Sequence, residues 1–290
     1  MSKLFDFSLT GTLLALPFVQ TALIAAALLG LVAGVLGPLI VTRNMAFSVH
    51  ATSEIAFTGG AAALLFGFGV GYGALGAAVV TAVVLGVLST RKADRDSVIG
   101  AVLTFGLGIG VFLLWIYPGR SGNKFGLLTG QIVGVDSGQL GLFAGCTVVV
   151  LAVLAVIYRP LLFASVDPEV AAARGVPVRA LSPVFAVLVG IATSLGVQTV
   201  GALLVVALMI TPGAAAARIT ADPLRATVLA VVFAELSMVG GLVLSLAPGA
   251  PISAFVTAIS FLIYLCCRIL GRARAGGLGV FKTLQVRVEG

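Results

Sequence analysis

Charged side chains are scarce in this chain of 290 residues, because Asp, Glu, Lys and Arg together make up only 9% of it. Hydrophobic residues account for 60%, and the mean hydropathy is +1.22. A soluble domain of this length has too little interior to hide so much apolar surface from water. The composition therefore excludes a soluble globular protein and predicts a polytopic membrane protein.

Cysteine and catalytic motifs are also sparse. Cys146, Cys266 and Cys267 lie in apolar segments without redox or metal spacing, so we expect them to pack rather than react. The segment nearest to a phosphate-binding loop is 276–283, but it has Phe281 where a Walker loop requires glycine, and no strand precedes it. We therefore expect no ATPase or other catalytic site in this chain, and no permanently bound cofactor.

Apolar segments long enough to cross a bilayer recur along the whole chain. We expect an all-α helical bundle of eight or nine transmembrane helices. Residues 1–17 would form an N-terminal interfacial segment, 18–270 the transmembrane domain and 271–290 a cytoplasmic tail. The spans 180–197 and 199–217 are separated only by Gln198 and its neighbours, so they are either two short helices or one broken pair of helices. The candidate spans are 18–41, 46–68, 72–90, 98–118, 138–158, 180–197, 199–217, 226–246 and 251–270.

Basic residues between these spans predict the orientation. Four groups fall on one side, which the positive-inside rule assigns to the cytoplasm, and the N-terminus is then outside. Arg120 and Lys124 are the exceptions on the outer side. Because the cations flank spans and can meet anionic lipid, the net charge of +7 requires no nucleic-acid partner. The four groups are Arg91, Lys92 and Arg95; Arg159, Arg174 and Arg179; Arg218 and Arg225; and Arg268, Arg272, Arg274 and Lys282.

A polar and charged segment, 165–179, interrupts the apolar spans. Asp167 is placed to cap a helix, Pro168 suits the first helical position, and Glu169 adds negative charge to the first turn. Gly175 can end the helix, with Pro177 just beyond it. The sequence therefore predicts a compact helix over 167–175, outside the membrane.

This short helix needs a binding partner. Its apolar members are few and small, so resting on lipid would contribute little free energy, although an amphipathic segment can lie on the membrane surface. A groove in another protein is the better partner. Asp167, Glu169 and Arg174 would contact the rim of that groove, and Gly175 would allow close approach.

Polar groups within spans are costly and tend to be functional. His50 is the only histidine, and Glu54 follows four residues later, so both side chains lie on one face of a helix. Imidazole and carboxylate are ligands for zinc, manganese or ferrous iron, and two copies facing across a homodimer pore would supply four ligands. The alternative is that His50 and Glu54 pair only with each other. Glu235, the other acidic residue deep in a span, lines the pathway, bonds a neighbouring serine or sits neutral in the bundle.

Four blocks of the sequence resemble permease subunits of ABC importers for manganese, zinc and iron. The capped segment 167–179, with its Asp-Pro-Glu and Arg-Gly-Val-Pro-Val-Arg, is similar to the cytoplasmic coupling helix of that family. The block 198–212 (Gln-Thr-Val-Gly-Ala to Thr-Pro), the block 43–47 (Arg-Asn-Met-Ala-Phe) and the block 96–100 (Asp-Ser-Val-Ile-Gly) add to the likeness. The resemblance extends over about residues 20–270.

The resemblance implies a permease of the type II ABC importer kind in the bacterial cytoplasmic membrane. It would form a homodimer and work with an ABC ATPase and an extracytoplasmic metal-binding protein. The family carries an acidic residue and then a histidine on the cation pathway, whereas this chain has His50 and then Glu54. Histidine plus glutamate makes zinc the first expected cargo and manganese the next. The alternatives are a proton-coupled secondary transporter that uses Glu235 or Glu54, and an ABC permease for a metal chelate or vitamin.

Overall fold

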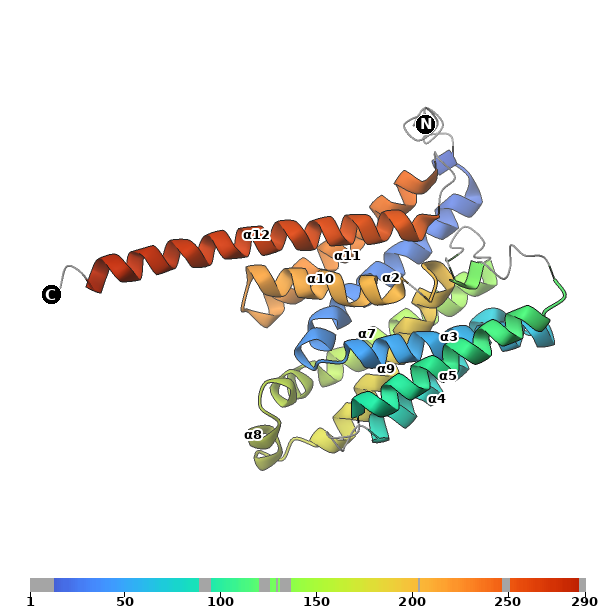
Figure 1. Cartoon of the computed structure of the whole chain (residues 1–290), viewed down its shortest axis with the longest axis horizontal. Coiled ribbons are helices and arrows are strands. Elements are labelled where there is room, and N and C mark those ends of the chain that lie inside the picture. The colour runs from blue at the N-terminus through green and yellow to red at the C-terminus, as the bar shows by residue number, and fades with distance from the viewer. Residues whose placement is uncertain are drawn as a thin grey trace.

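The computed structural model describes residues 13–88, 95–119, 126–128, 130, 137–202, 204–246 and 251–286. All regular elements in these ranges are helices, which confirms the expected all-α bundle. Nine long helices and one short one are labelled in Figure 1. Arg91, Lys92, Arg120 and Lys124, which contributed to the predicted orientation, lie outside the described residues, as do residues 1–12 of the N-terminal segment. The helices are α2 (Pro17–Thr42), α3 (Ala46–Phe66), α4 (Val70–Leu88), α5 (Arg95–Ile116), α7 (Ser137–Val166), α8 (Pro168–Ala173), α9 (Val178–Thr199), α10 (Val205–Ile219), α11 (Pro223–Leu246) and α12 (Ile252–Val286).

The long helices divide into two packed groups. In the first group α10 and α11 contact each other and both α2 and α12, and in the second group α3 contacts α4, α5 and α9 (Figure 1). Helix α7 contacts both α2 and α9 and so joins the groups. Within the described part of the chain, six helices have the length and apolar composition to cross a membrane. Helix α3 is not among these six, and it carries His50, Glu54 and four hydroxyl residues.

Glycine permits the closest helix contacts in the first group. A Cβ at Gly34 of α2 would lie 2.3 Å from the Cα of Val231 in α11. A Cβ at Gly213 of α10 would lie 2.4 Å from the carbonyl carbon of Gly37 in α2. These backbone-to-backbone approaches leave no room for any other residue, as is typical of membrane helices that associate through small residues.

The two spans around Gln198 are a broken pair. Helix α9 ends at Thr199 and α10 begins at Val205, with Gly201 between them at φ +91°. A Cβ at Gly201 would lie 2.2 Å from the carbonyl oxygen of Leu128, so both the left-handed backbone and the close approach require glycine here. The helix α12 continues without a break to Val286, so no change of secondary structure separates the transmembrane domain from the predicted tail at residue 271.

Candidate metal pathway and docking helix

His50 and Glu54 lie on one face of α3, as their spacing predicts. The His50 Nδ1 and Glu54 Oε1 atoms are 3.9 Å apart, which is too long for a hydrogen bond. The Glu54 side chain is 1% exposed and the His50 side chain 36% exposed, so the pair extends from the packed interior to the surface of the chain. Two ligand atoms at about 2.1 Å from one ion are at most about 4.2 Å apart, so this pair can bind a single metal ion.

Two buried atoms of this pair find no hydrogen-bond partner among the described residues: Nδ1 of His50 and Oε2 of Glu54. Buried polar atoms are normally satisfied, and an unsatisfied one requires an explanation. Both atoms are of the types that bind transition metals. The pair therefore offers two ligand-type atoms that a metal ion could bind, whereas the 3.9 Å separation also allows an ion pair between a protonated His50 and Glu54.

Helix α5 holds the Glu54 turn in place. The Thr58 hydroxyl donates to the Glu54 carbonyl oxygen at 2.9 Å and also contacts the Gly106 carbonyl oxygen of α5. A Cβ at Gly106 would lie 2.5 Å from Cδ1 of Ile55. Glycine at position 106 therefore lets α5 pack directly against the turn that carries Glu54.

Glu235 lies in a different part of the molecule. Its carboxylate rests on Gly30 of α2, where an added Cβ would be 3.0 Å from Cδ of Glu235. This position is within the contact between α2 and α11, which belong to the first group of helices. Within the described residues, no cluster of three or more His, Cys, Asp or Glu side chains is able to hold a metal ion. The chain thus brings His50 and Glu54 together but does not add Glu235 to them.

The short helix α8 forms as its sequence predicts. Asp167 is the N-cap, and its Oδ1 accepts a hydrogen bond from the Val170 backbone N–H at 3.0 Å. The chain leaves the helix through Gly175, whose φ of +82° is in the left-handed region. Glu169 and Arg174 are exposed and Asp167 is partly exposed, whereas Ala171 is buried against the bundle. Helix α8 therefore projects from one end of the molecule with its polar side chains accessible to a partner (Figure 1).

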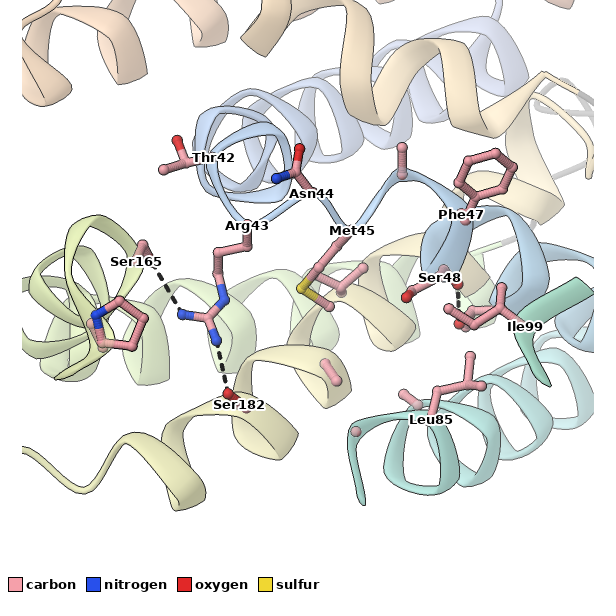
Figure 2. A pocket seen from close by; sticks show the side chains of 18 of the residues that line it. Thr42, Arg43, Asn44, Met45, Phe47, Ser48, Leu85, Ile99, Ser165 and Ser182 are labelled. Atoms are coloured by element: carbon pink, nitrogen blue, oxygen red, sulfur yellow. Dashed lines mark hydrogen bonds between the residues drawn. The ribbon is translucent and has the colours of Figure 1, made fainter. Parts of the chain in front are cut away.

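A cavity of about 780 Å³ lies beside α8. It is enclosed by the turn between α2 and α3, the last turn of α4, the first turns of α5 and α9, and the end of α7. Ser48 and Thr52 line the cavity, but His50 and Glu54 do not, because at 100° per residue they face the other side of α3. Among the described residues that line the cavity, Arg43 is charged and none is a carboxylate (Figure 2).

The sequence pattern assigns no role to Arg43, although this residue begins one of the blocks that carry the family resemblance. In the structure, Arg43 donates hydrogen bonds to the hydroxyl oxygens of Ser165 and Ser182 (Figure 2). Its guanidinium lies 5.6 Å from the ring centroid of Phe185. The two serines are 122 and 139 positions away from Arg43. No periodicity or local spacing indicates such a contact.

A multi-pass helical bundle with a capped helix projecting from one end is the architecture of an ABC transporter membrane subunit. Residues 15–271 match the model of the ABC 3 transport family, and the chain belongs to this family. It is a multi-pass permease of the bacterial cell membrane, as the resemblance implied.

Two relatives illustrate the similarity in sequence. The chain is 33% identical over 234 residues to the manganese transport system membrane protein MntC of Halalkalibacterium halodurans, covering 80% of each chain. It is 32% identical over 200 residues to the manganese import system permease protein ScaB of Streptococcus parasanguinis, covering 69% of this chain and 71% of that protein.

Two solved structures are similar in fold. PsaBC from Streptococcus pneumoniae in complex with Fab matches with a TM-score of 0.79 at 25% identity, covering 88% of this chain and 92% of the matched chain. An inward-facing conformation of a putative metal-chelate type ABC transporter matches with a TM-score of 0.64 at 21% identity, covering 87% of this chain and 84% of that one. The second likeness, at this low identity, concerns the fold alone.

Proposed function

We propose that this chain is the permease subunit of an ATP-driven importer of divalent transition metal, with manganese(II) as the first cargo to test and zinc(II) as the second. The two relatives described above are named for manganese transport, which favours manganese. The histidine and glutamate pair suits zinc equally well in its ligand chemistry. Delivery by a binding protein can override the intrinsic affinity order of the metals.

The observation that carries the proposal is the pair of unsatisfied buried atoms on α3. The Nδ1 atom of His50 and the Oε2 atom of Glu54 lack partners, and these two side chains are close enough to share an ion. A transport site must bind its ion weakly enough to release it, and a site with few protein ligands meets that requirement.

A homodimer would complete this site. One protomer supplies two ligands, and the partly exposed His50 side chain reaches the protomer surface. Two copies related by a two-fold axis would present four ligands to an ion in a central pore, the number that zinc prefers. The pathway would then lie between the protomers, away from the cavity beside α8.

ATP hydrolysis would occur in a separate ABC ATPase subunit. Helix α8 would dock in a groove of that subunit, with Asp167, Glu169 and Arg174 contacting its rim and Gly175 allowing close approach. Closure of the ATPase on ATP would push α8 and shift the bundle between outward-open and inward-open states. An extracytoplasmic metal-binding protein would deliver the ion from the other side.

The test is metal uptake into proteoliposomes that contain the permease, its ATPase and its binding protein. Wild type is compared with the double variant His50→Ala plus Glu54→Ala, with manganese and zinc offered separately. We expect ATP-dependent uptake of one ion in wild type and its collapse in the double variant, while the complex still assembles and hydrolyses ATP. Unchanged uptake in the double variant would show that the pair is structural and refute the metal-relay role.

Two alternatives give different outcomes in the same experiment. A proton-coupled secondary transporter would take up metal under an imposed pH gradient without an ATPase. A permease for a metal chelate or vitamin would transport its ligand without His50, since the metal is already coordinated. The similarity to the ABC 3 transport family favours the ATP-driven importer over the first alternative.

A further inference from the structure

Arg43 occupies the short turn that joins α2 to α3. Its Nη1 donates to Oγ of Ser165 at 3.1 Å, and its Nη2 donates to Oγ of Ser182 at 2.8 Å. The same guanidinium lies over the ring of Phe185, which is fully buried in α9. The planar guanidinium presents several donors in a fixed geometry, so a single side chain holds both serines at once.

The two serines lie on either side of the docking helix. Ser165 is in the last turn of α7, two residues before the N-cap Asp167, and Ser182 is in the second turn of α9. Arg43 is therefore bonded to both segments through which the chain enters and leaves α8. Any displacement of α8 that moves the ends of α7 and α9 must also move, stretch or break these two bonds.

The turn that carries Arg43 is short and internally bonded. The Arg43 backbone N–H bonds to the Leu39 carbonyl oxygen, and the Met45 N–H bonds to the Ile40 carbonyl oxygen, each at 3.0 Å. Asn44 adopts the left-handed conformation at φ +52°, and α3 begins two residues later. Only Asn44 and Met45 separate Arg43 from the start of α3, so a shift of Arg43 is transmitted to the first turn of that helix. His50 lies in the second turn of α3.

Space for such a shift exists beside α3. The cavity of about 780 Å³ borders Phe47, Ser48 and Thr52, which form one side of the first two turns of this helix. Interiors of proteins are otherwise closely packed and resist displacement. The start of α3 therefore has open space beside it into which it can move.

We propose that Arg43 is the positioning residue that couples displacement of the docking helix α8 to movement of α3, the helix that bears His50 and Glu54. The inference rests on the proposed function, in which an ATPase displaces α8. Arg43 does not touch the cargo in this scheme, and it acts through the two serines and the turn before α3.

The first experiment measures movement of α3 without reference to the cargo. A cysteine is introduced by Phe47→Cys, since Phe47 is 67% exposed, in a background with Cys146→Ala, Cys266→Ala and Cys267→Ala. The complete complex is labelled with a hydrophilic maleimide in the absence of nucleotide and after trapping with ATP and vanadate. We expect trapping to change the labelling rate in this background, and we expect Arg43→Gln to abolish that change. The inference would be overturned if trapping still changed the labelling rate in the Arg43→Gln variant, or if trapping did not change the labelling rate when Arg43 is present.

The second experiment measures ions transported per ATP hydrolysed, with manganese as the probe. We expect Arg43→Gln to lower this ratio by about tenfold, which corresponds to about 1.4 kcal/mol of coupling free energy. The double variant Ser165→Ala plus Ser182→Ala should also lower the ratio, and combining it with Arg43→Gln should cost less than the sum of the two separate losses, because the three residues are bonded to one another. Arg43→Lys should give an intermediate ratio, since an ammonium lacks the fork that holds both serines.

Arg225→Gln is the matched control, because Arg225 is exposed and its ion pair with Asp222 joins neither α8 nor α3. It should leave the ratio unchanged. If Arg43→Gln reduces assembly with the ATPase or thermal stability as much as it reduces uptake, Arg43 is only a structural residue and the inference fails. An ATP-dependent labelling change without metal uptake in the unsubstituted complex would refute the proposed cargo and leave the role of Arg43 intact.

Discussion

Glu54 and Glu235 each lie in the middle of an apolar helix of this permease, and their surroundings differ in one respect that decides what each can do. Glu54 on α3 has a histidine within 3.9 Å and an unsatisfied buried oxygen. Glu235 on α11 lies on Gly30 at the contact between two helices, and the only histidine of the sequence lies beside Glu54 instead. Position in an apolar span marks both as candidates, but only a neighbouring ligand type turns a buried carboxylate into a candidate metal site.

The contact between α2 and α11, the helix that carries Glu235, is expected to be the most sensitive to a change in packing. The substitution Gly34→Ala would place a Cβ 2.3 Å from the Cα of Val231, and neither backbone can move away cheaply. We expect a loss of at least about 2 kcal/mol in stability, the scale of overpacking in a well-packed interior. The measurement is the thermal unfolding of the purified protein in detergent.

Gly76→Ala is the matched control for that substitution, since a Cβ at Gly76 meets no atom within 4 Å. It should leave the unfolding temperature unchanged or raise it slightly, because alanine favours a helix more than glycine does. Equal effects of the two substitutions would show that α2 and α11 are not packed as closely as described.

The next largest effect is expected at Glu54. The substitution Glu54→Gln keeps the shape of the side chain but removes its charge, and a neutral amide is a weaker ligand for a divalent cation than a carboxylate. We expect ATP-dependent metal uptake to fall by about tenfold or more, the lower end of what changes near a metal site usually cause. Uptake in proteoliposomes measures the loss, and ATP hydrolysis by the same complex is the control. Retained uptake would place Glu54 in the same class as Glu235.

Much of the architecture was predictable because its signals are local. Hydropathy over about 20 residues located the nine long helices, and the capping pattern around Asp167 located α8. The spacing of His50 and Glu54 on one helix made their proximity predictable from the sequence alone. Each of these inferences depends on residues that are close together in the sequence.

The contacts between distant segments were not predictable in the same way. The helices are uniformly apolar, so hydropathy does not indicate which helix packs against which or where a side chain meets its neighbour. The bonds from Arg43 to Ser165 and Ser182 and the placement of Glu235 on Gly30 are contacts of this kind. The cavity beside α8 likewise depends on five segments that only the tertiary structure brings together.

A smaller effect is expected from Gly30→Ala. The added Cβ would lie 3.0 Å from Cδ of Glu235, but this atom is at the end of a flexible side chain that can rotate away. We expect less than about 1 kcal/mol of destabilisation, partly offset by the higher helix propensity of alanine. Thermal unfolding in detergent checks the value against Gly34→Ala on the same helix. A loss as large as that of Gly34→Ala would mean that the Glu235 carboxylate is held rigidly and has a role of its own.

The smallest effect is expected from Glu235→Gln. The amide has nearly the same size as the carboxylate and can rest on Gly30 in the same way, and the only histidine of the sequence lies beside Glu54, not beside Glu235. We expect ATP-dependent uptake within about twofold of wild type, as is usual for substitutions away from a site or a tight contact. Uptake driven by an imposed proton gradient is measured on the same proteoliposomes. If Glu235→Gln abolished transport while Glu54→Gln spared it, the two carboxylates would exchange roles, and a proton-coupled mechanism centred on α11 would replace the metal relay on α3.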